Sequence, residues 1–204
     1  MMPVMNGITM CKILKEDVRT SHIPIILLTA KDSLQDKEEG YQVGADSYLT
    51  KPFSATLLHS RINNLLESRK RLTERFNTST PHHNMDEKRA LLAESLNKLD
   101  NEFIEKINQL IEARLSSEKI DIGYLADNMC MSKSTLYRKM KALTGLSTNE
   151  YVRKIKMQHA ERLLLEGRYN ISEVAFRVGI NSVVYFRQCF KEEFGVLPSE
   201  YLKQ

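Results

Sequence analysis

Seven basic side chains fall within residues 132–156, a stretch whose one acidic side chain is Glu150. These basic residues are Lys133, Arg138, Lys139, Lys141, Arg153, Lys154 and Lys156. A local excess of positive charge of this size on a folded module indicates a polyanionic partner such as nucleic acid. Charge alone leaves a second interpretation open, in which these residues form an ordinary solvated face of a helix.

The same region contains an internal repeat. A shift of 50 residues pairs Ser132 with Ser182, and a shift of 49 residues pairs Ala126 with Ala175. Each unit is predicted to be a short helix, a tight turn and a second helix that begins at a serine N-cap. The alanines allow the two helices of a unit to cross closely, as a helix-turn-helix requires. A long helix over residues 147–167 is predicted to join the two units.

Two such units at this spacing resemble the DNA-binding domain of AraC-type transcription regulators. The segment ISEVAFRVGINSVVYFRQCFKEEFGVLPSEY is close to the C-terminal signature of that family. The resemblance covers about residues 100–204 and implies an all-α domain with two helix-turn-helix units that bind double-stranded DNA. One departure is Thr148, where the family often has proline, and it leaves the fold assignment intact.

The second helix of the first unit has one apolar face. Leu136, Met140 and Leu143 recur at helical spacing and are predicted to face the core, which turns the opposite side chains to solvent. The candidate DNA-binding residues are Ser134, Thr135, Tyr137, Arg138 and Lys141. Arg138 is the first choice for a guanine contact, because its guanidinium can bond O6 and N7 together. A contact of Arg138 with a phosphate is the alternative.

In the second unit, Phe186 and Phe190 are predicted to point inward. The candidate DNA-binding residues there are Val183, Val184, Tyr185, Arg187 and Gln188. The valines suit thymine methyl groups, and Gln188 suits adenine. Residues 182–204 hold as many acidic as basic side chains, so we expect the first unit to supply most of the salt-dependent affinity. Both helices are expected to enter successive major grooves, about one turn apart.

The front of the chain follows a different pattern. Residues 1–53 alternate helical and strand patterns, which is typical of an open α/β sheet. The run IPIILLTA, residues 23–30, is predicted to be a strand buried on both faces, and residues 46–50 to be a second strand. A long helix is predicted from Ser54 to Phe76. The polar, proline-containing residues 77–86 are predicted to be a linker, followed by a connecting helix to residue 99.

The segments MMPVMNG, PIILLTA and SYLTKPF resemble the second half of a response-regulator receiver domain, a flavodoxin-like fold. The resemblance assigns Thr29 to the hydroxyl that bonds the phosphoryl oxygen, Lys51 to the lysine that pairs with its charge, and Tyr48 to the aromatic that turns inward on activation. It also implies a cis peptide bond between Lys51 and Pro52.

The pattern D-x-M-M-P of that family places the phosphoacceptor aspartate two residues before Met1. We therefore expect this chain to lack the phosphoacceptor, the acidic pair that binds Mg²⁺ and about half of the receiver domain. Without them, the chain is not expected to phosphorylate itself. The incomplete sheet is expected to self-associate, because its apolar strand lacks neighbours.

Composition excludes several other classes. No stretch approaches the ~18 to 20 apolar residues of a membrane span, and no signal peptide is evident, so a cytoplasmic location is expected. Cys11, Cys130 and Cys189 are scattered and are interpreted as small apolar residues in a reducing compartment. The pair His82 and His83 lies in the polar linker and is interpreted as solvated. No nucleophile and base set, carboxylate pair or phosphate loop indicates an enzyme, and no cofactor is expected outside a complete receiver.

The sequence therefore predicts three parts: a truncated receiver domain over residues 1–76, a linker and connecting helix over residues 77–99, and a DNA-binding domain over residues 100–204. This order resembles the end of hybrid two-component regulators, an organisation typical of Bacteroidetes. The predicted function is a sequence-specific DNA-binding transcription regulator at the output end of a phosphorelay, with RNA polymerase as a further partner. The rival hypothesis is a protein-interaction fragment that acts through the receiver remnant.

Overall fold

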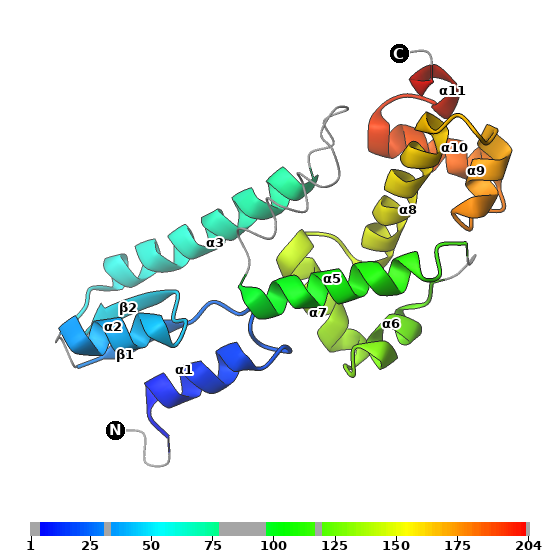
Figure 1. Cartoon of the computed structure of the whole chain (residues 1–204). Helices are drawn as coiled ribbons and strands as arrows, with labels where there is room; N and C mark the ends of the chain where they lie inside the picture. The colour runs from blue at the N-terminus through cyan, green and yellow to red at the C-terminus, as the bar shows by residue number, and fades with distance from the viewer. Residues whose placement is uncertain (1–4, 31–33, 78–96, 117–119, 203–204) are drawn as a thin grey trace.

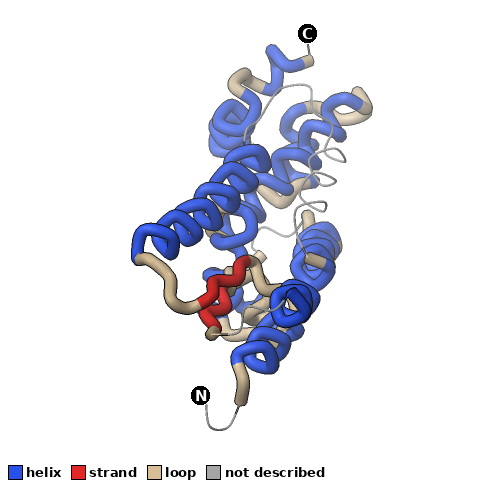
Figure 2. The backbone as a smooth tube through the Cα atoms, turned by 90° about the vertical axis from the view of Figure 1, so that its left-hand side faces the viewer, coloured by secondary structure: helices blue, strands red, loops and turns tan. Residues whose placement is uncertain are grey.

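The computed structural model describes residues 5–30, 34–77, 97–116 and 120–202. The chain is elongated, with the α/β segment at one end and the last helices at the other (Figure 1). The small sheet stands out within an otherwise helical molecule (Figure 2). The architecture is therefore a partial α/β unit followed by an all-α domain, as the sequence predicts.

The α/β segment begins with α1, Gly7–Glu16, which starts after Asn6 because the Asn6 side chain accepts a hydrogen bond from the Thr9 amide at 2.7 Å. It continues through β1 (Ile26–Thr29), α2 (Leu34–Gln42) and β2 (Ser47–Thr50). The two strands pair in parallel, with Leu27 opposite Tyr48. A small core of Cys11, Leu27, Ala45 and Tyr48 holds α1 against the strands.

The prediction that the first strand is buried on both faces is wrong. Leu27 is buried, but the next residue, Leu28, is 44% exposed, and Ile23 just before the strand is exposed as well. The described residues form a two-stranded sheet, so one face of β1 lacks the covering elements that a parallel strand normally has.

A long helix, α3, spans Ala55–Asn77, close to its predicted bounds. Asn77, the first residue of the predicted linker, is the last residue of α3. The rest of the predicted linker and most of the predicted connecting helix lie outside the described residues. The next described helix, α5, spans Lys98–Glu112 and begins two residues before the predicted domain start. Asn97 caps it by accepting a hydrogen bond from the Asp100 amide at 2.9 Å.

The first helix-turn-helix unit consists of α6 (Ile122–Asn128) and α7 (Lys133–Thr144), and α8 (Thr148–Leu165) leads away from it. Leu125 and Ala126 of α6 pack against Leu136 and Met140 of α7, in a core completed by α5. Helix α8 begins at Ser147 with a capping box, in which Ser147 and Glu150 satisfy each other's amides. This box fixes the direction in which α8 leaves the first unit.

The second unit repeats this arrangement with α9 (Ile171–Arg177) and α10 (Val183–Phe194), followed by the short helix α11, Pro198–Tyr201. Its core is aromatic: the Phe190 ring lies 4.5 Å from Phe194 and 5.6 Å from Tyr201, centroid to centroid. Ala175 is fully buried where α9 crosses its neighbours. The duplication predicted from the sequence is therefore present in the fold.

The turns of the two units also match, although their residues differ. Gly179 adopts φ +66°, and at the equivalent place in the first unit Cys130 adopts φ +52°. Left-handed backbone is unfavourable for a residue with a Cβ atom. Cys11 and Cys189 are buried, whereas Cys130 is exposed. Within the described residues, no helix has both the length and the apolar character to cross a membrane.

Candidate nucleic-acid interface

Helix α7 is held by its apolar face and its caps. The Ser132 side chain accepts a hydrogen bond from the Thr135 amide at 3.1 Å, which starts the helix as predicted. Leu136, Met140 and Leu143 are all buried. Gly145, at φ +74°, ends the helix in the left-handed conformation. These constraints fix which side of α7 faces outward.

The outward side of α7 carries four of the five candidate residues of this unit. Ser134, Arg138 and Lys141 are exposed, and Tyr137 is 45% exposed. The Arg138 Nε atom donates a hydrogen bond to the Ser134 carbonyl at 3.3 Å, which aligns the side chain with the helix axis. Thr135 differs, because it is only partly exposed and its hydroxyl lies 2.9 Å from that of Ser132. Thr135 therefore supports the cap.

Helix α10 presents a second outward face. Ser182 caps it by accepting a hydrogen bond from the Tyr185 amide at 3.3 Å, and Phe186 and Phe190 are fully buried. The exposed candidates are Val184, Tyr185, Arg187 and Gln188. Val184 is 77% exposed, an unfavourable position for an apolar side chain without a partner. Val183, the remaining candidate of this unit, is only partly exposed.

Three of the seven basic residues counted in the sequence cannot belong to a phosphate-binding surface. Lys139, Lys154 and Lys156 are buried. Their side chains have internal partners: Asp100 for Lys139, Glu193 at 3.4 Å for Lys154, and the Gly179 carbonyl at 3.2 Å for Lys156. Counting charges along the chain overstates the basic surface, because a count does not distinguish the two sides of a helix.

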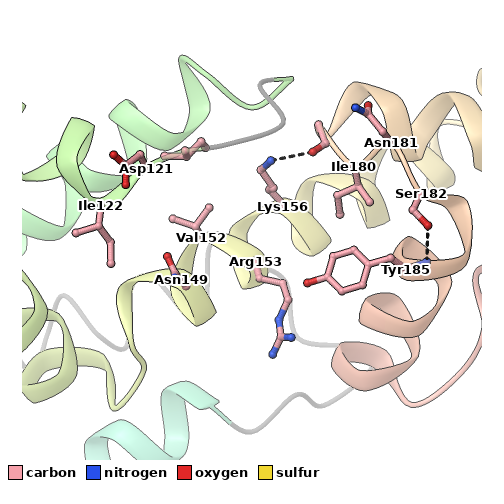
Figure 3. A pocket seen from close by; sticks show the side chains of 12 residues that line it. Asp121, Ile122, Asn149, Val152, Arg153, Lys156, Ile180, Asn181, Ser182 and Tyr185 are labelled. Atoms are coloured by element: carbon pink, nitrogen blue, oxygen red, sulfur yellow. Dashed lines mark hydrogen bonds between the residues drawn. The ribbon is translucent and has the colours of Figure 1, made fainter.

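A groove of about 1010 Å³ lies between the two units. Its floor includes Val152 of α8 and Ile180, and its two sides are the start of α6 and the start of α10 (Figure 3). Arg153 stands at this groove, with its guanidinium 3.5 Å from the Glu192 carboxylate. Tyr185, a candidate DNA-contacting residue, lines the groove from α10. The groove therefore runs beside one of the two outward faces.

The second unit is bound to α8 by ion pairs that could not be predicted from the sequence. Lys154 reaches Glu193 and Arg153 reaches Glu192, so two neighbouring residues of α8 bind two neighbouring residues of α10. Lys156 donates to the Gly179 carbonyl in the turn between α9 and α10 (Figure 3). These contacts set the orientation of the second unit relative to α8, and hence relative to the first unit.

Two of the three predicted receiver switch residues, Thr29 and Lys51, lie at the carboxyl edge of the small sheet, and Tyr48 lies further back in β2. Thr29 ends β1 and is partly buried, Tyr48 in β2 is buried, and Lys51 follows β2 and is exposed. Thr29 and Tyr48 line a hollow of about 410 Å³, which Lys51 does not line. The peptide bond between Lys51 and Pro52 is cis, as the resemblance implied. The switch roles of these three residues stay predictions.

The described residues do not offer a Mg²⁺ site at this edge. The hollow is lined by one acidic side chain, Glu39, together with Asn6, the hydroxyl-bearing Thr29 and Tyr48, and apolar residues. Among the described residues, no three His, Cys, Asp or Glu side chains come together in a way that could hold a metal ion. Carboxylate oxygens are the protein ligands that Mg²⁺ prefers, so the residues present do not fit the ion and no step is assigned to it.

Comparison with known proteins identifies both parts of the chain. Residues 1–63 match the model of the response regulator receiver domain, and residues 125–204 match a helix-turn-helix domain model. Histidine kinase P4 of Formosa agariphila is 36% identical over 98% of this chain, and the chain spans 14% of that relative. The helix-turn-helix match begins within α6.

Two solved structures are similar to the C-terminal part. The C-terminal domain of AraT, a response regulator from Geobacillus stearothermophilus, is 31% identical, with a TM-score of 0.46 over 50% of this chain and 84% of that one. The DNA-binding domain of AdpA in complex with a target DNA is 30% identical, with a TM-score of 0.45 over 50% of this chain and 89% of that one. Together the two matches show a receiver segment followed by an AraC-type helix-turn-helix domain.

Proposed function

We propose that this chain is a sequence-specific DNA-binding transcription regulator, the output end of a two-component (hybrid) phosphorelay. One observation carries the proposal: two serine-capped helices, α7 and α10, present exposed faces from matching units that α8 holds in a fixed relation. An α-helix fits the major groove of B-DNA, and residues of its N-terminal part reach base edges.

The two helices differ in the contacts they can make. Arg138 and Lys141 give α7 exposed positive charge, so α7 supplies phosphate contacts together with a guanine contact from Arg138. Helix α10 offers Val184 to a thymine methyl group and Gln188 to adenine. In the free protein, the Gln188 amide donates to Glu192 at 3.2 Å, so DNA binding exchanges this hydrogen bond for one to a base.

The regulator acts on DNA in the cytoplasm, and RNA polymerase is its expected further partner. We assign no catalytic step to the chain, because its parts belong to a family of DNA-binding regulators. The receiver segment is the input part of the proposed regulator. The receiver segment then passes its conformational state to the DNA-binding units.

A second function is favoured by the exposed apolar side chains of the receiver segment. Met10 and Ile13 on α1 and Leu28 on β1 are more than one third exposed. Apolar side chains left uncovered in this way favour self-association or binding of another protein. Light scattering at increasing protein concentration tests this function independently of DNA: growth of the particle mass supports it, and a constant monomer mass contradicts it.

The DNA-binding function is tested by selecting duplexes from a random pool with the wild-type chain. Arg138→Ala is expected to lose preference at one base pair by about 1–3 kcal/mol while it keeps weaker, general binding. Arg71→Ala, an exposed arginine on α3 that pairs with Glu67, is the matched control and is expected to keep the preference. A pool in which wild type enriches no sequence contradicts the proposed function.

A further inference from the structure

Lys139 lies on the inner side of α7 and binds the receiver segment. Its ammonium donates to the Val18 carbonyl at 2.5 Å, to the Ser21 hydroxyl at 2.8 Å and to the Asp100 carboxylate at 2.5 Å. An ammonium has three donors, so this set uses all of them. Two of the three acceptors belong to the loop between α1 and β1, and the third belongs to α5.

The acceptor side of this junction is equally complete. Oδ1 of Asp100 accepts from Lys139 and from the Ser21 hydroxyl, the latter at 2.6 Å, and Oδ2 accepts from the Asn97 amide at 2.9 Å. The Asn97 side chain also donates to the Ser21 carbonyl at 3.3 Å. Ser21, Asp100 and Lys139 are all buried. Buried polar groups that satisfy one another fully hold a single arrangement.

Apolar contacts accompany these polar ones. Val18, a residue of the receiver segment, packs against the core of the first helix-turn-helix unit. The Lys139 ammonium also lies 4.8 Å from the centre of the Phe103 ring in that core. The receiver loop is therefore part of the support on which α7 rests.

The position of Lys139 on α7 connects this support to the outward face. Lys139 lies between Arg138, which faces outward, and Met140, which is fully buried. If the receiver loop moved away, two donors of a buried ammonium would lose their acceptors. The cost of leaving such groups unpaired favours a movement of α7 or of its side chain. A displacement of the receiver loop is therefore expected to shift α7, the helix that carries the DNA-contacting residues of the first unit.

We propose that Lys139 is a positioning residue that joins the receiver loop, residues 17–22, to α7 and so couples the receiver segment to the DNA-contacting face. The consequence for DNA rests on the proposed function, whereas the coupling itself does not. Receiver and first unit then move as one body, and the path from receiver to DNA runs directly through this junction as well as through the intervening chain.

Hydrogen exchange tests the coupling in the free protein. Ser21→Ala removes one acceptor of Lys139 and leaves every residue of the DNA-binding domain in place. We expect it to speed exchange of the α7 amides of residues 136–144 at least tenfold, although Ser21 is more than a hundred residues away in sequence. The α10 amides of residues 186–194 are the internal reference and are expected to change less than twofold.

Lys139→Met is expected to act in both directions, speeding exchange in α7 and in the receiver loop. Lys106→Met removes an exposed lysine from α5 and is the matched control without effect on either. If Lys139→Met does not fold, Ser21→Ala alone decides the matter. The proposal is overturned if exchange in α7 stays within twofold of wild type, or if α7 and α10 accelerate equally, which would indicate global destabilisation.

DNA binding is then measured on the same variants with a duplex selected by the wild-type chain. Ser21→Ala is expected to weaken the preference for that duplex over a scrambled one by about three- to tenfold. If wild type prefers no duplex, the proposed function fails while the exchange result still decides the coupling. If Ser21→Ala and Lys139→Met prefer the duplex as strongly as wild type does, and hydrogen exchange in α7 is unchanged, the coupling fails while the proposed function stands.

Discussion

His22 makes the junction between receiver segment and DNA-binding domain sensitive to acid. Its side chain is buried, and its Nδ1 atom has no hydrogen-bond partner among the described residues. Burial, reinforced by the nearby positive charge of Lys139, lowers the pKa of His22 from 6.5 to about 4, and Asp100 opposes this only in part. Arg69 and Lys15 add further positive charge near the ring. The native structure therefore favours neutral His22.

The size of the effect follows from the two pKa values. Between pH 6.5 and pH 4, His22 binds a proton in the unfolded chain but not in the folded one, so the free energy of unfolding falls as the pH falls. With 1.36 kcal/mol for each pKa unit, the loss is about 2 kcal/mol between pH 7.5 and pH 5 and about 3 kcal/mol when the change is complete.

Urea unfolding at pH 7.5 and pH 5 measures this loss. The chain has no tryptophan, so far-UV circular dichroism is the appropriate probe. His22→Gln, which does not titrate, is expected to lose less than half as much free energy of unfolding as wild type over the same pH range. His59→Gln changes an exposed histidine of α3 and is expected to behave as wild type. Equal losses in wild type and His22→Gln would refute the reasoning.

Five further substitutions, in three experiments, test the fold and the surface. Gly179→Ala is expected to lower the free energy of unfolding by about 1–2 kcal/mol, because residue 179 has left-handed backbone. Cys130→Gly, at the equivalent position, is expected to leave the free energy of unfolding unchanged or to raise it by up to about 1 kcal/mol. Chemical denaturation in which Cys130→Gly is the more destabilising change contradicts this. Phe190→Ala is expected to cost about 3–5 kcal/mol, since the ring is fully buried; thermal unfolding within 2 °C of wild type would show that the aromatic core is not needed. Lys141→Ala is expected to reduce the slope of log DNA affinity against log salt concentration by about 1. Lys154→Met, at a buried lysine, is expected to destabilise the protein and to leave that slope unchanged. Salt titrations of DNA binding that show the opposite pattern contradict the placement of these lysines.

The helical units could be predicted because their signals are local. Leu136 and Met140 recur at helical spacing, Ser132 has the side chain of an N-cap, and Gly145 can adopt the conformation that ends a helix. Duplication made each signal visible twice. For the same reason Phe186 was placed in the core of the second unit, where it is fully buried.

The buried contacts between the receiver segment and the DNA-binding domain could not be predicted, because they join residues that are far apart in the chain. Lys139 lies at the position three after Leu136 and four before Leu143, which a helical projection places toward the inner side. Its acceptors Val18 and Ser21 come from another part of the chain, and nothing local pairs them. Leu28 shows the reverse error: the apolar run predicts burial, but burial depends on which neighbours cover the strand.

The central claim is that α7 and α10 bind one DNA duplex together. Hydroxyl-radical footprinting of the wild-type chain on a selected duplex tests it most directly. The account predicts two protected stretches on one face of the duplex, centred about 10 base pairs apart, of which Arg138→Ala weakens one and Gln188→Ala the other. A single protected stretch, or two stretches on opposite faces, would contradict it.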